Sequence, residues 1–431
     1  MRKTKLFPHQ IDALEQTEEF NRCAYYLDMG LGKTFVGSEK MMQLGAKVNL
    51  VVCQKSKVED WVEHFQKYYD CCVYDLTDNS KRGKLYAADA FARIKHEAFI
   101  CPFILVINYE LAFRRPWLKE LKDFTLMLDE SSMIQNERAK RSKFILKLQP
   151  KNVILLSGTP TGGKYEKLWS QCHLLGWPIS KNLYWKQYID TETKDFDGVP
   201  IKIVKCYKNV ERLKSKLRRY GAVFMKSEEV FDLPEQIDTT INVNTSKEYR
   251  KFRKDSIVTV DDVELVGDTS LTKMLYERQL CGQYNKDKLN AFRDLLESTN
   301  DRLIVFYNFT EEKVKLHAIA ENEYDRPCSE ISGNHKTLMA YEYDDSSVTF
   351  IQYQAGAMGL NLQKANKIVY FTPPLSSELF EQSKKRIHRI GQEKSCFYYY
   401  LTCRNSIEEK IYSTLAMRKD YTEKLFEEER T

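Results

Sequence analysis

The order of apolar and polar positions divides the chain into short buried strands separated by helical segments. Apolar runs of strand length occur at Val48–Cys53, Phe103–Asn108, Phe124–Asp129, Val153–Leu156 and Arg302–Tyr307. Apolar positions at helical spacing lie among them, as in Lys288–Leu296. Strands that alternate with helices predict βαβ units and parallel sheets, so the expected fold class is α/β with two parallel-sheet lobes in tandem.

The pattern changes in the middle of the chain, where residues 177–235 are basic and aromatic. Leu213 and Leu217 are four apart with cations between them, which predicts an amphipathic helix with a positive face. That face is either solvated or a DNA contact. We therefore expect an N-terminal lobe at 1–176, a small helical protrusion and bridge at 177–235, and a C-terminal lobe at 236–431.

Two further features describe the second lobe. The interval between Ser332–His335 and Val348–Gln352 leaves little room, so one helix of this lobe must be short or absent. Near the end, Ser406 and Glu409 are three apart and precede an amphipathic pattern, which is the signature of a capping box. We expect the final helix to begin there and to pack on the second lobe.

Length and composition fit this division. A chain of 431 residues and 50.8 kDa exceeds one ordinary core, which favours two domains. The proportions of hydrophobic (42%) and charged (30%) residues are those of a globular protein. A net charge of +6 is modest for this length, so it favours local basic patches for a polyanion over a uniformly basic body.

The eleven cysteines include no C-x-x-C pair, and only Cys71 and Cys72 are adjacent. This spacing predicts reduced thiols and no zinc site. The first residues lack the apolar stretch of a signal peptide, and no apolar run approaches membrane-spanning length. We expect a protein with no membrane association, in the cytoplasm of a bacterium or phage-infected cell, or in the nucleus if it is eukaryotic.

The clearest chemical signal is the stretch Tyr25–Thr34, where an apolar run breaks into glycines before a helical pattern. Gly30 and Gly32 allow backbone N–H groups to turn around an anion, Lys33 supplies charge for the outer phosphates, and the Thr34 hydroxyl can hold Mg²⁺. The strict pattern G-x-x-x-x-G-K-[ST] fails at its first position. An ordinary strand-to-helix turn therefore stays an alternative interpretation.

Two later stretches favour the phosphate interpretation. The apolar strand that ends at Asp129 is followed by Glu130, so Asp129 can hold Mg²⁺ and Glu130 can polarise an attacking water. Arg386 and Arg389 are three apart and share one helix face. Phosphoryl transfer from ATP needs a loop that holds the phosphates, one acid for the metal and one for the water, and arginines that stabilise the charge. The chain contains these groups in that order.

Five motifs resemble those of the Swi/Snf-type ATPases of helicase superfamily two. They are Asp28–Thr34 (DMGLGKT), the Asp129-Glu130 pair, Leu156–Pro160 (LSGTP), Ala355–Leu362 (AGAMGLNL) and Arg386–Gln392 (RIHRIGQ). The last is the most family-specific, and the resemblance covers nearly the whole chain. It implies RecA-like lobes, ATP and Mg²⁺ as cofactors, and movement on double-stranded DNA.

The resemblance also implies roles for single residues. Gln10 would read adenine, although from its position alone it is equally well a surface helix residue. Ser157 and Thr159 would respond to Glu130 and couple the ATP state to motion. Gly359 and Asn361 lie in a small-residue segment where the backbone would approach a phosphate or sugar, and a tight turn is the alternative.

Other roles concern the cations. The resemblance assigns Arg386 and Arg389 to the ATP phosphates across a cleft between the lobes. It places a DNA-backbone contact at Lys55–Lys57, where a solvated loop is the plainer interpretation. His388 lies within the cationic run that starts at Lys384, and we expect it to be structural or orienting.

Two departures from the family pattern leave the mode of action open. Ser131-Ser132 stand where the family usually has Ala-His, and Gly162-Gly163 replace the usual continuation after Gly-Thr-Pro. Neither touches the proposed metal or base residues, so they bear on coupling to motion. The favoured function is a DNA-stimulated ATPase that translocates on duplex. The alternatives are a strand-separating helicase and a nucleotide-gated DNA clamp with little turnover. We expect a monomer, and any partner nuclease, replication or recombination protein stays open.

Overall fold

The computed structural model describes residues 5–78, 80–97, 99–196, 199–333, 335–356 and 360–426. The chain forms two compact units. The first unit comprises Met1–Val230 and Tyr421–Thr431, and the second unit comprises Phe231–Asp420. Each unit is built around its own parallel sheet.

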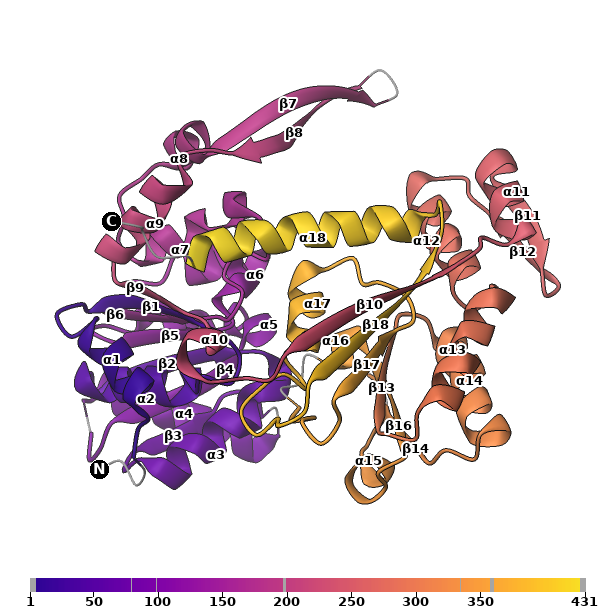
Figure 1. Ribbon diagram of the computed structural model, residues 1–431. Coiled ribbons are helices and arrows are strands. Elements are labelled where there is room, and N and C mark those ends of the chain that lie inside the picture. The colour runs from indigo at the N-terminus through magenta and orange to yellow at the C-terminus, as the bar shows by residue number, and fades with distance from the viewer. Residues whose placement is uncertain are drawn as a thin grey trace. The chain divides into compact units, whose positions relative to one another are not determined.

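The first unit contains a seven-stranded sheet in the order β3-β4-β2-β5-β6-β1-β9, with every neighbouring pair parallel (Figure 1). The strands are β1 Arg22–Leu27, β2 Val48–Cys53, β3 Cys72–Asp75, β4 Phe103–Asn108, β5 Thr125–Asp129, β6 Asn152–Leu156 and β9 Ala222–Met225. The main strands are buried on both faces, which explains why they read as continuous apolar runs.

Helices cover this sheet. They are α1 Pro8–Glu15, α2 Lys33–Gln43, α3 Val58–Tyr68, α4 Lys81–Lys95, α5 Tyr109–Ala112, α6 Lys140–Ile145, α7 Trp169–Leu174 and α10 Ser227–Val230. Helix α2 packs closely on the sheet at Gly37, where a Cβ would lie 2.9 Å from side-chain atoms of both Leu156 and Met127. The absence of a side chain at Gly37 therefore sets how near α2 can approach β5 and β6.

The segment before β9 holds a β-hairpin that the sequence pattern did not predict. Helices α8 Lys181–Tyr188 and α9 Val210–Arg219 flank the antiparallel strands β7 Ile189–Phe196 and β8 Val199–Tyr207. The hairpin projects from α8, away from the sheet of the first unit (Figure 1). Leu213 and Leu217 are buried as predicted for the amphipathic helix. The expected protrusion is therefore present, but it is not wholly helical.

The second unit repeats the architecture with the order β10-β18-β17-β13-β16-β14-β15. All neighbours are parallel except β14 and β15, which are antiparallel. The strands are β10 Gln236–Val243, β13 Leu303–Tyr307, β14 Cys328–Ile331, β15 Lys336–Thr337, β16 Val348–Gln352, β17 Lys367–Tyr370 and β18 Cys396–Cys403. A separate hairpin pairs β11 Ile257–Val260 with β12 Val263–Val266. Two parallel-sheet α/β lobes in tandem, as predicted, are confirmed.

The helices of the second unit pack in separate cores on the two faces of its sheet, and residues of α11 and α12 form a further core with the β11–β12 hairpin. The helices are α11 Lys247–Asp255, α12 Ser270–Cys281, α13 Lys286–Ser298, α14 Thr310–Ala318, α15 Met339–Tyr343, α16 Tyr353–Gly356, α17 Ser377–Lys384 and α18 Ile407–Phe426. Ile304 and Phe306 of β13 join one core with residues of α17 and α18, whereas Val305 and Tyr307 join the other with residues of α13 and α14. This alternation is what a strand buried on both faces requires. The short helix expected before β16 is α15, with five residues.

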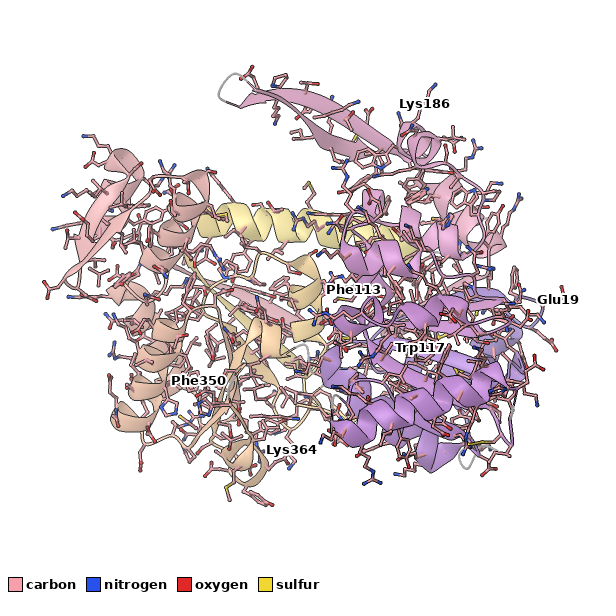
Figure 2. All side chains as sticks on the ribbon, turned by 180° about the vertical axis from the view of Figure 1, so that it is seen from behind. Glu19, Phe113, Trp117, Lys186, Phe350 and Lys364 are labelled. Carbon is pink, nitrogen blue, oxygen red and sulfur yellow. A yellow bond between two sulfur atoms is a disulfide. The ribbon has the colours of Figure 1, made fainter. Side chains whose placement is uncertain are left out.

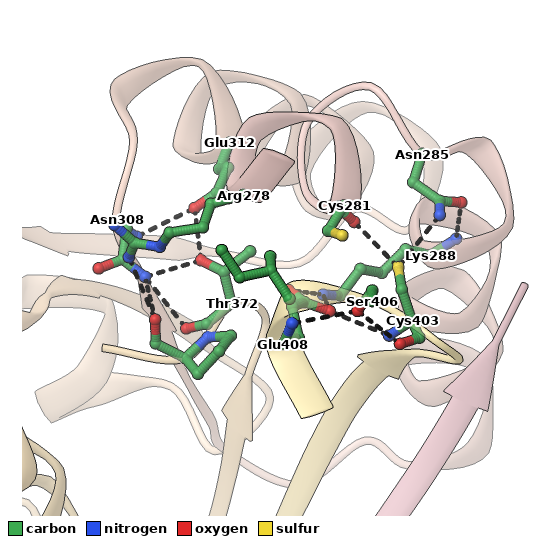
Figure 3. Close-up of polar contacts among 12 residues, drawn as sticks. Arg278, Cys281, Asn285, Lys288, Asn308, Glu312, Thr372, Cys403, Ser406 and Glu408 are labelled. Atoms are coloured by element: carbon green, nitrogen blue, oxygen red, sulfur yellow. Dashed lines mark hydrogen bonds and ion pairs between the residues drawn. The ribbon is translucent and has the colours of Figure 1, made fainter. Parts of the chain in front are cut away.

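A buried ion pair fixes the start of α18, which begins after Ser406 as the capping pattern predicted. The Ser406 hydroxyl accepts the Glu408 N–H at 3.1 Å. Lys288 Nζ lies 2.6 and 2.7 Å from the two carboxylate oxygens of Glu408, and both side chains are fully buried (Figure 3). Burial on its own lowers the pKa of Lys288, but Glu408 and the thiols of Cys403 and Cys281 oppose it, and the net shift is upward.

The cysteines correct one prediction. Cys72 and Cys101 form a disulfide with their Cα atoms 6.3 Å apart, so the expectation of reduced thiols holds only for the other nine cysteines. The two lie 29 positions apart, and sequence spacing gave no sign that they meet. Among the residues that the structure describes, no helix combines the length and apolarity needed to cross a bilayer.

Candidate active site

The loop between β1 and α2 has the backbone that the glycine pattern predicted. Gly30 and Gly32 have φ values of 91° and 72°, in the left-handed region that side chains disfavour. Leu27, which occupies the first position of the strict motif, is the last residue of β1 and is fully buried. The departure at that position is therefore a core residue that the strand needs, and the loop itself begins afterwards.

Lys33 opens α2 and folds back over this loop. Its Nζ donates to the carbonyl oxygens of Leu27 at 2.8 Å and Asp28 at 3.2 Å. A Cβ at Gly158 would lie 3.3 Å from the same Nζ, so the LSGTP segment passes directly beside the lysine. A helix N-terminus with a lysine and glycine-rich backbone offers several positive groups to one anion.

Gln10 lies against the loop and is 3% exposed. Its Nε2 donates to the Leu31 carbonyl at 3.2 Å, and its Oε1 accepts the Phe7 N–H at 3.0 Å. A Cβ at Gly32 would lie 2.2 Å from Gln10 Nε2, and the φ of 72° disfavours a side chain at this position, so Gly32 lets the amide pack against the loop. The alternative that Gln10 is a surface helix residue is wrong.

Asp129 ends β5 and is oriented by a tryptophan of α3. Trp61 Nε1 donates to Asp129 Oδ2 at 2.8 Å. Burial raises the pKa of Asp129, while the Trp61 hydrogen bond and the charge of Lys33 act in the opposite direction. Asp129 is thus the last residue of β5, and the charge of Lys33 acts on its carboxylate.

Glu130 has a left-handed backbone, with φ 51° and ψ 63°. The Tyr109 hydroxyl donates to the carbonyls of Asp129 at 2.9 Å and Glu130 at 3.3 Å, which holds this turn. Ser157 Oγ donates to Glu130 Oε2 at 3.2 Å and accepts the Thr159 N–H at 3.1 Å. The LSGTP segment thus contacts Glu130 directly through Ser157, and Thr159 joins through Ser157.

The arginine motif of the second unit is anchored by its neighbours. Lys384 is buried, contacts the rings of Phe380, Tyr398 and Tyr400, and its Nζ lies 3.0 Å from Asp238 Oδ1. His388 Nε2 donates to the Pro234 carbonyl at 2.9 Å. That bond agrees with a structural or orienting role for His388, and Lys384 is an anchor for the fold and not a solvated cation.

Arg386 and Arg389 follow the end of α17 at Lys384 and lie in turns and bends, so the prediction that they share a helix face is wrong. They also differ in exposure. Arg386 is 1% exposed, whereas Arg389 is half-buried and burial lowers its pKa. The Leu362 N–H donates to the Arg386 carbonyl at 3.1 Å, and Gln392 Nε2 donates to the Ala365 carbonyl at 2.8 Å. The first bond ties the arginine motif to Leu362 at the end of the AGAMGLNL segment, and the second ties it to Ala365, three residues later.

Two predicted residues of that segment have different outcomes. Asn361 is exposed, next to the buried Leu362. Gly359 lies outside the described residues.

Only some of the side chains predicted to contact DNA are exposed and outside ion pairs with acidic residues. Lys57 pairs with Asp60 at 2.7 Å, while Lys55 and Ser56 are exposed. On α9, Lys214 is buried and lies 3.0 Å from Glu211, so the positive face is narrower than the sequence suggested.

Another basic surface lies at the base of the β7–β8 hairpin, where Lys186 sits on the outer side of α8 (Figure 2). It is a groove of about 490 Å³ whose lining is free of acidic side chains: Lys181, Asn182, Trp185, Lys186, Ile189, Thr191 and Lys202. Lys181 also pairs with Glu137. A surface of this charge fits a phosphate backbone.

Sequence reasoning missed three side chains that shape the site. Trp61 orients Asp129, Tyr109 holds the backbone of Glu130, and the Gln171 amide bonds Ser131. None has a motif of its own, because each acts through a contact that is distant in the sequence.

Comparison with known proteins gives family matches over most of the chain. The model of the SNF2-related domain matches residues 17–288, and that of the helicase conserved C-terminal domain matches residues 287–391. The uncharacterized ATP-dependent helicase MG018 of Mycoplasma genitalium is 21% identical over 93% of this chain and 40% of the relative. The ISWI chromatin-remodeling complex ATPase ISW1 of Saccharomyces cerevisiae is 23% identical over 99% of this chain and 41% of the relative.

One further relative and one solved structure are also similar to this chain. The putative ATP-dependent helicase/translocase YwqA of Bacillus subtilis is 22% identical over 93% of this chain and 46% of the relative. The chain thus spans less than half the length of these curated relatives. Among solved structures, the Sulfolobus solfataricus SWI2/SNF2 ATPase core in complex with dsDNA has a TM-score of 0.46 and 20% identity, over 98% of this chain and 93% of that one.

Proposed function

The chain belongs to the SNF2-related family, as its motifs predicted, and we propose that it hydrolyses ATP in the first unit to move along double-stranded DNA. The observation that carries the proposal is the convergence of Lys33, Glu130 and Ser157 around the Gly30–Gly32 loop, with Asp129 beside them. These are the groups that phosphoryl transfer needs within one site.

The residues present fit ATP and Mg²⁺. The left-handed glycines present backbone without side chains to a phosphate chain, and Lys33 would exchange its carbonyl partners for the outer phosphates. Mg²⁺ prefers oxygen ligands, which the Asp129 carboxylate and the Thr34 hydroxyl supply. When bound, the ion would supply charge neutralisation on the phosphates. Trp61 would keep Asp129 in a fixed orientation, using the oxygen Oδ2.

Glu130 is the proposed base that orients the attacking water. One carboxylate oxygen accepts the Ser157 hydroxyl, so the direction of the side chain depends on the LSGTP segment. A shift of that segment would change where the carboxylate points. This link supports the proposal that hydrolysis and motion are coupled through Ser157.

The remaining nucleotide contacts belong to the same proposal. Gln10 would exchange its bond to the Leu31 carbonyl for the edge of adenine, since an amide offers both a donor and an acceptor. Gly359 and Asn361 would approach a phosphate or sugar from the second unit. Arg386 and Arg389 would stabilise charge on the transferred phosphoryl group. Half-buried Arg389 suits that task best, because its guanidinium combines partial exposure with a desolvated setting in which electrostatic attraction is stronger.

Movement along duplex is proposed from the family and from the names of relatives, which include ATP-dependent helicase and helicase/translocase. The exposed Lys55 and the hairpin groove would contact the DNA backbone, which makes binding independent of sequence and sensitive to salt. Strand separation and a clamp with little turnover are the competing functions.

The decisive experiment measures ATPase rate with no nucleic acid, single strand, duplex and fork, together with displacement of a third strand from a triplex. Duplex-stimulated hydrolysis with triplex displacement and intact duplex supports translocation. Separation of duplex strands would identify a helicase, and tight duplex binding without turnover would identify a clamp. Lys33→Ala, which should weaken nucleotide binding, shows that any turnover belongs to this chain.

A further inference from the structure

Gln171 of α7 joins three segments of the first unit through one fully buried amide. Its Oε1 accepts the Tyr26 hydroxyl at 2.9 Å and the Ser131 hydroxyl at 2.8 Å. Its Nε2 donates to the Pro160 carbonyl at 2.8 Å. The carbonyl oxygen of the amide thus has both of its acceptor positions in use, so the orientation of the side chain is fixed.

Two of these partners are chain neighbours of proposed site residues. Ser131 directly follows Glu130, and Pro160 directly follows Thr159. The Tyr26 hydroxyl anchors the amide from β1. Gln171 therefore stands between the turn that carries the proposed base and the LSGTP segment that contacts this base through Ser157.

The turn at Glu130 needs such support. A glutamate at φ 51° is in a conformation that residues other than glycine rarely adopt, and it persists only where surrounding contacts determine it. Tyr109 holds the carbonyl of Glu130 on one side. On the other side, the Ser131 hydroxyl is held by Gln171, so the turn is fastened at both ends.

We propose that Gln171 is a positioning residue that holds the Glu130 turn and the LSGTP segment in register, with Ser131 as its contact on the Glu130 side. The inference rests on the proposed ATPase function. It also assigns a role to Ser131, which belongs to one of the two departures from the family pattern. The Ser131 hydroxyl links the Glu130 turn to the Gln171 amide, which also bonds the Pro160 carbonyl. A shift of Pro160 would therefore move the Glu130 turn.

Two single substitutions separate positioning from ordinary stability. Ser131→Ala and Tyr26→Phe each remove one buried hydrogen bond to the same Gln171 oxygen, so each should lower the melting temperature by about 2–4 °C. Only Ser131→Ala releases the Glu130 turn. We expect it to reduce kcat on the order of 10-fold to 100-fold with an almost unchanged KM for ATP, because small misplacements of a catalytic group cost that much.

The control, Tyr26→Phe, should keep the wild-type kcat. A second comparison places Ser131→Ala in a Gln171→Met background, where the extra loss of kcat should vanish if Ser131 acts through Gln171. Equal kcat values for Ser131→Ala and Tyr26→Phe, or a full additional loss in the double variant, would overturn the inference while wild-type turnover still supports the proposed function. An inactive wild-type chain would overturn both.

Discussion

The two sheets share one architecture but use their carboxyl ends differently. In the first unit, the strand ends lead to a loop with left-handed Gly30 and Gly32, and Lys33 lies over bare backbone carbonyls. In the second unit, the strand ends are filled by side chains that bond one another. Asn308 donates to Thr372 Oγ1 at 2.8 Å, and that hydroxyl donates to Glu312 at 2.9 Å (Figure 3).

Glycine shows the same contrast. In the first unit, Gly30 has a left-handed backbone and is exposed, so its backbone is accessible to a ligand. In the second unit, Gly282 makes room for a carboxylate of the protein itself, since a Cβ there would lie 2.1 Å from Glu312 Oε1. We infer that polar groups at the carboxyl ends of the strands can exchange hydrogen-bond partners with a ligand in the first unit, whereas in the second unit they bond to one another. Substitutions in the first unit should affect turnover, and those in the second unit should affect stability, with Arg389 as the exception.

That exception gives the largest expected effect. Arg389→Ala should bind ATP and DNA almost normally but lose about 10³-fold to 10⁵-fold in DNA-stimulated turnover, as for other arginines that stabilise phosphoryl transfer. Arg389→Lys should substitute poorly, because lysine lacks the planar fork. Steady-state ATPase and DNA affinity should be measured on both, with exposed Arg404→Ala as control. Weaker, salt-sensitive DNA binding with intact turnover would instead make Arg389 a DNA contact.

Glu130→Gln should keep ATP binding and lose about 10²-fold to 10⁴-fold in turnover, the usual contribution of a general base. Its melting temperature should stay near the wild-type value, since the Ser157 hydroxyl can still donate to the amide oxygen. Nearby Glu110→Gln, where the glutamate side chain is exposed, is the matched control. Near-wild-type turnover in Glu130→Gln would remove Glu130 as the residue that orients water.

Glu408→Gln should be the most destabilising of these changes in the second unit. It leaves the Lys288 ammonium buried without its counter-charge, which costs about 3–5 kcal/mol of unfolding free energy. Replacing both members, as Lys288→Met with Glu408→Leu, should recover much of the loss. The control is Glu323→Gln in the exposed pair with Arg293, where a loss under about 1 kcal/mol is expected in urea unfolding.

Glu312 should make stability depend on pH. Burial raises its pKa from 4.5 to about 7 against the opposing hydrogen bonds from Asn308 and Phe309. Because the folded state holds the proton more tightly, this contribution is fully present below about pH 4.5 and is lost as pH rises through about 7, amounting to about 3 kcal/mol. Urea unfolding from pH 4.5 to 8 should show a weaker decline for Glu312→Gln than for wild type. Identical slopes would exclude Glu312 as the source.

The smallest effect concerns the hairpin groove. Lys202→Ala should reduce the slope of log DNA affinity against log salt by about 0.9, the value for one phosphate contact. Lys194→Ala is the control, because Lys194 pairs with Ile201 in the hairpin register, whereas Lys202 pairs with Thr193, which places the two lysines on opposite faces. Equal slopes for the two variants would remove the groove from the DNA path.

Much of the fold could be predicted from the sequence because buried parallel strands are continuous apolar runs. Val48–Cys53 and Phe103–Asn108 are strands with the predicted ends. The hairpin was missed because β7 is mostly polar, although Asp197-Gly198 is a dipeptide that favours hairpin turns. Spacing also gave no sign of the disulfide between Cys72 and Cys101.

The candidate site likewise contains residues that the sequence predicted and residues that it did not. Local signals predicted the left-handed glycines at Gly30 and Gly32, and the family pattern led to the bond between Ser157 and Glu130. The side chains that hold these groups, such as Gln171, come from elsewhere in the sequence. A local pattern carries no information about such partners, because a buried glutamine in a helix reads as an ordinary polar position. The roles proposed for the site residues and the domain boundaries stay predictions.

The position of β9 has a consequence for how the chain is made. Strand β9 pairs with β1, and just beyond it the Ser227 hydroxyl donates to Asp28 Oδ2 at 3.2 Å and to the Met29 carbonyl at 3.1 Å. Ser227 and Asp28 are 199 positions apart. At about 5–20 residues per second, the ribosome needs about 10–40 s to produce Ser227 after the loop around Asp28 and Met29 has been made. During synthesis, the loop after β1 therefore lacks its bonds to Ser227 until much of the first unit has been made. The edge of β1 that pairs with β9 stays unpaired for the same interval.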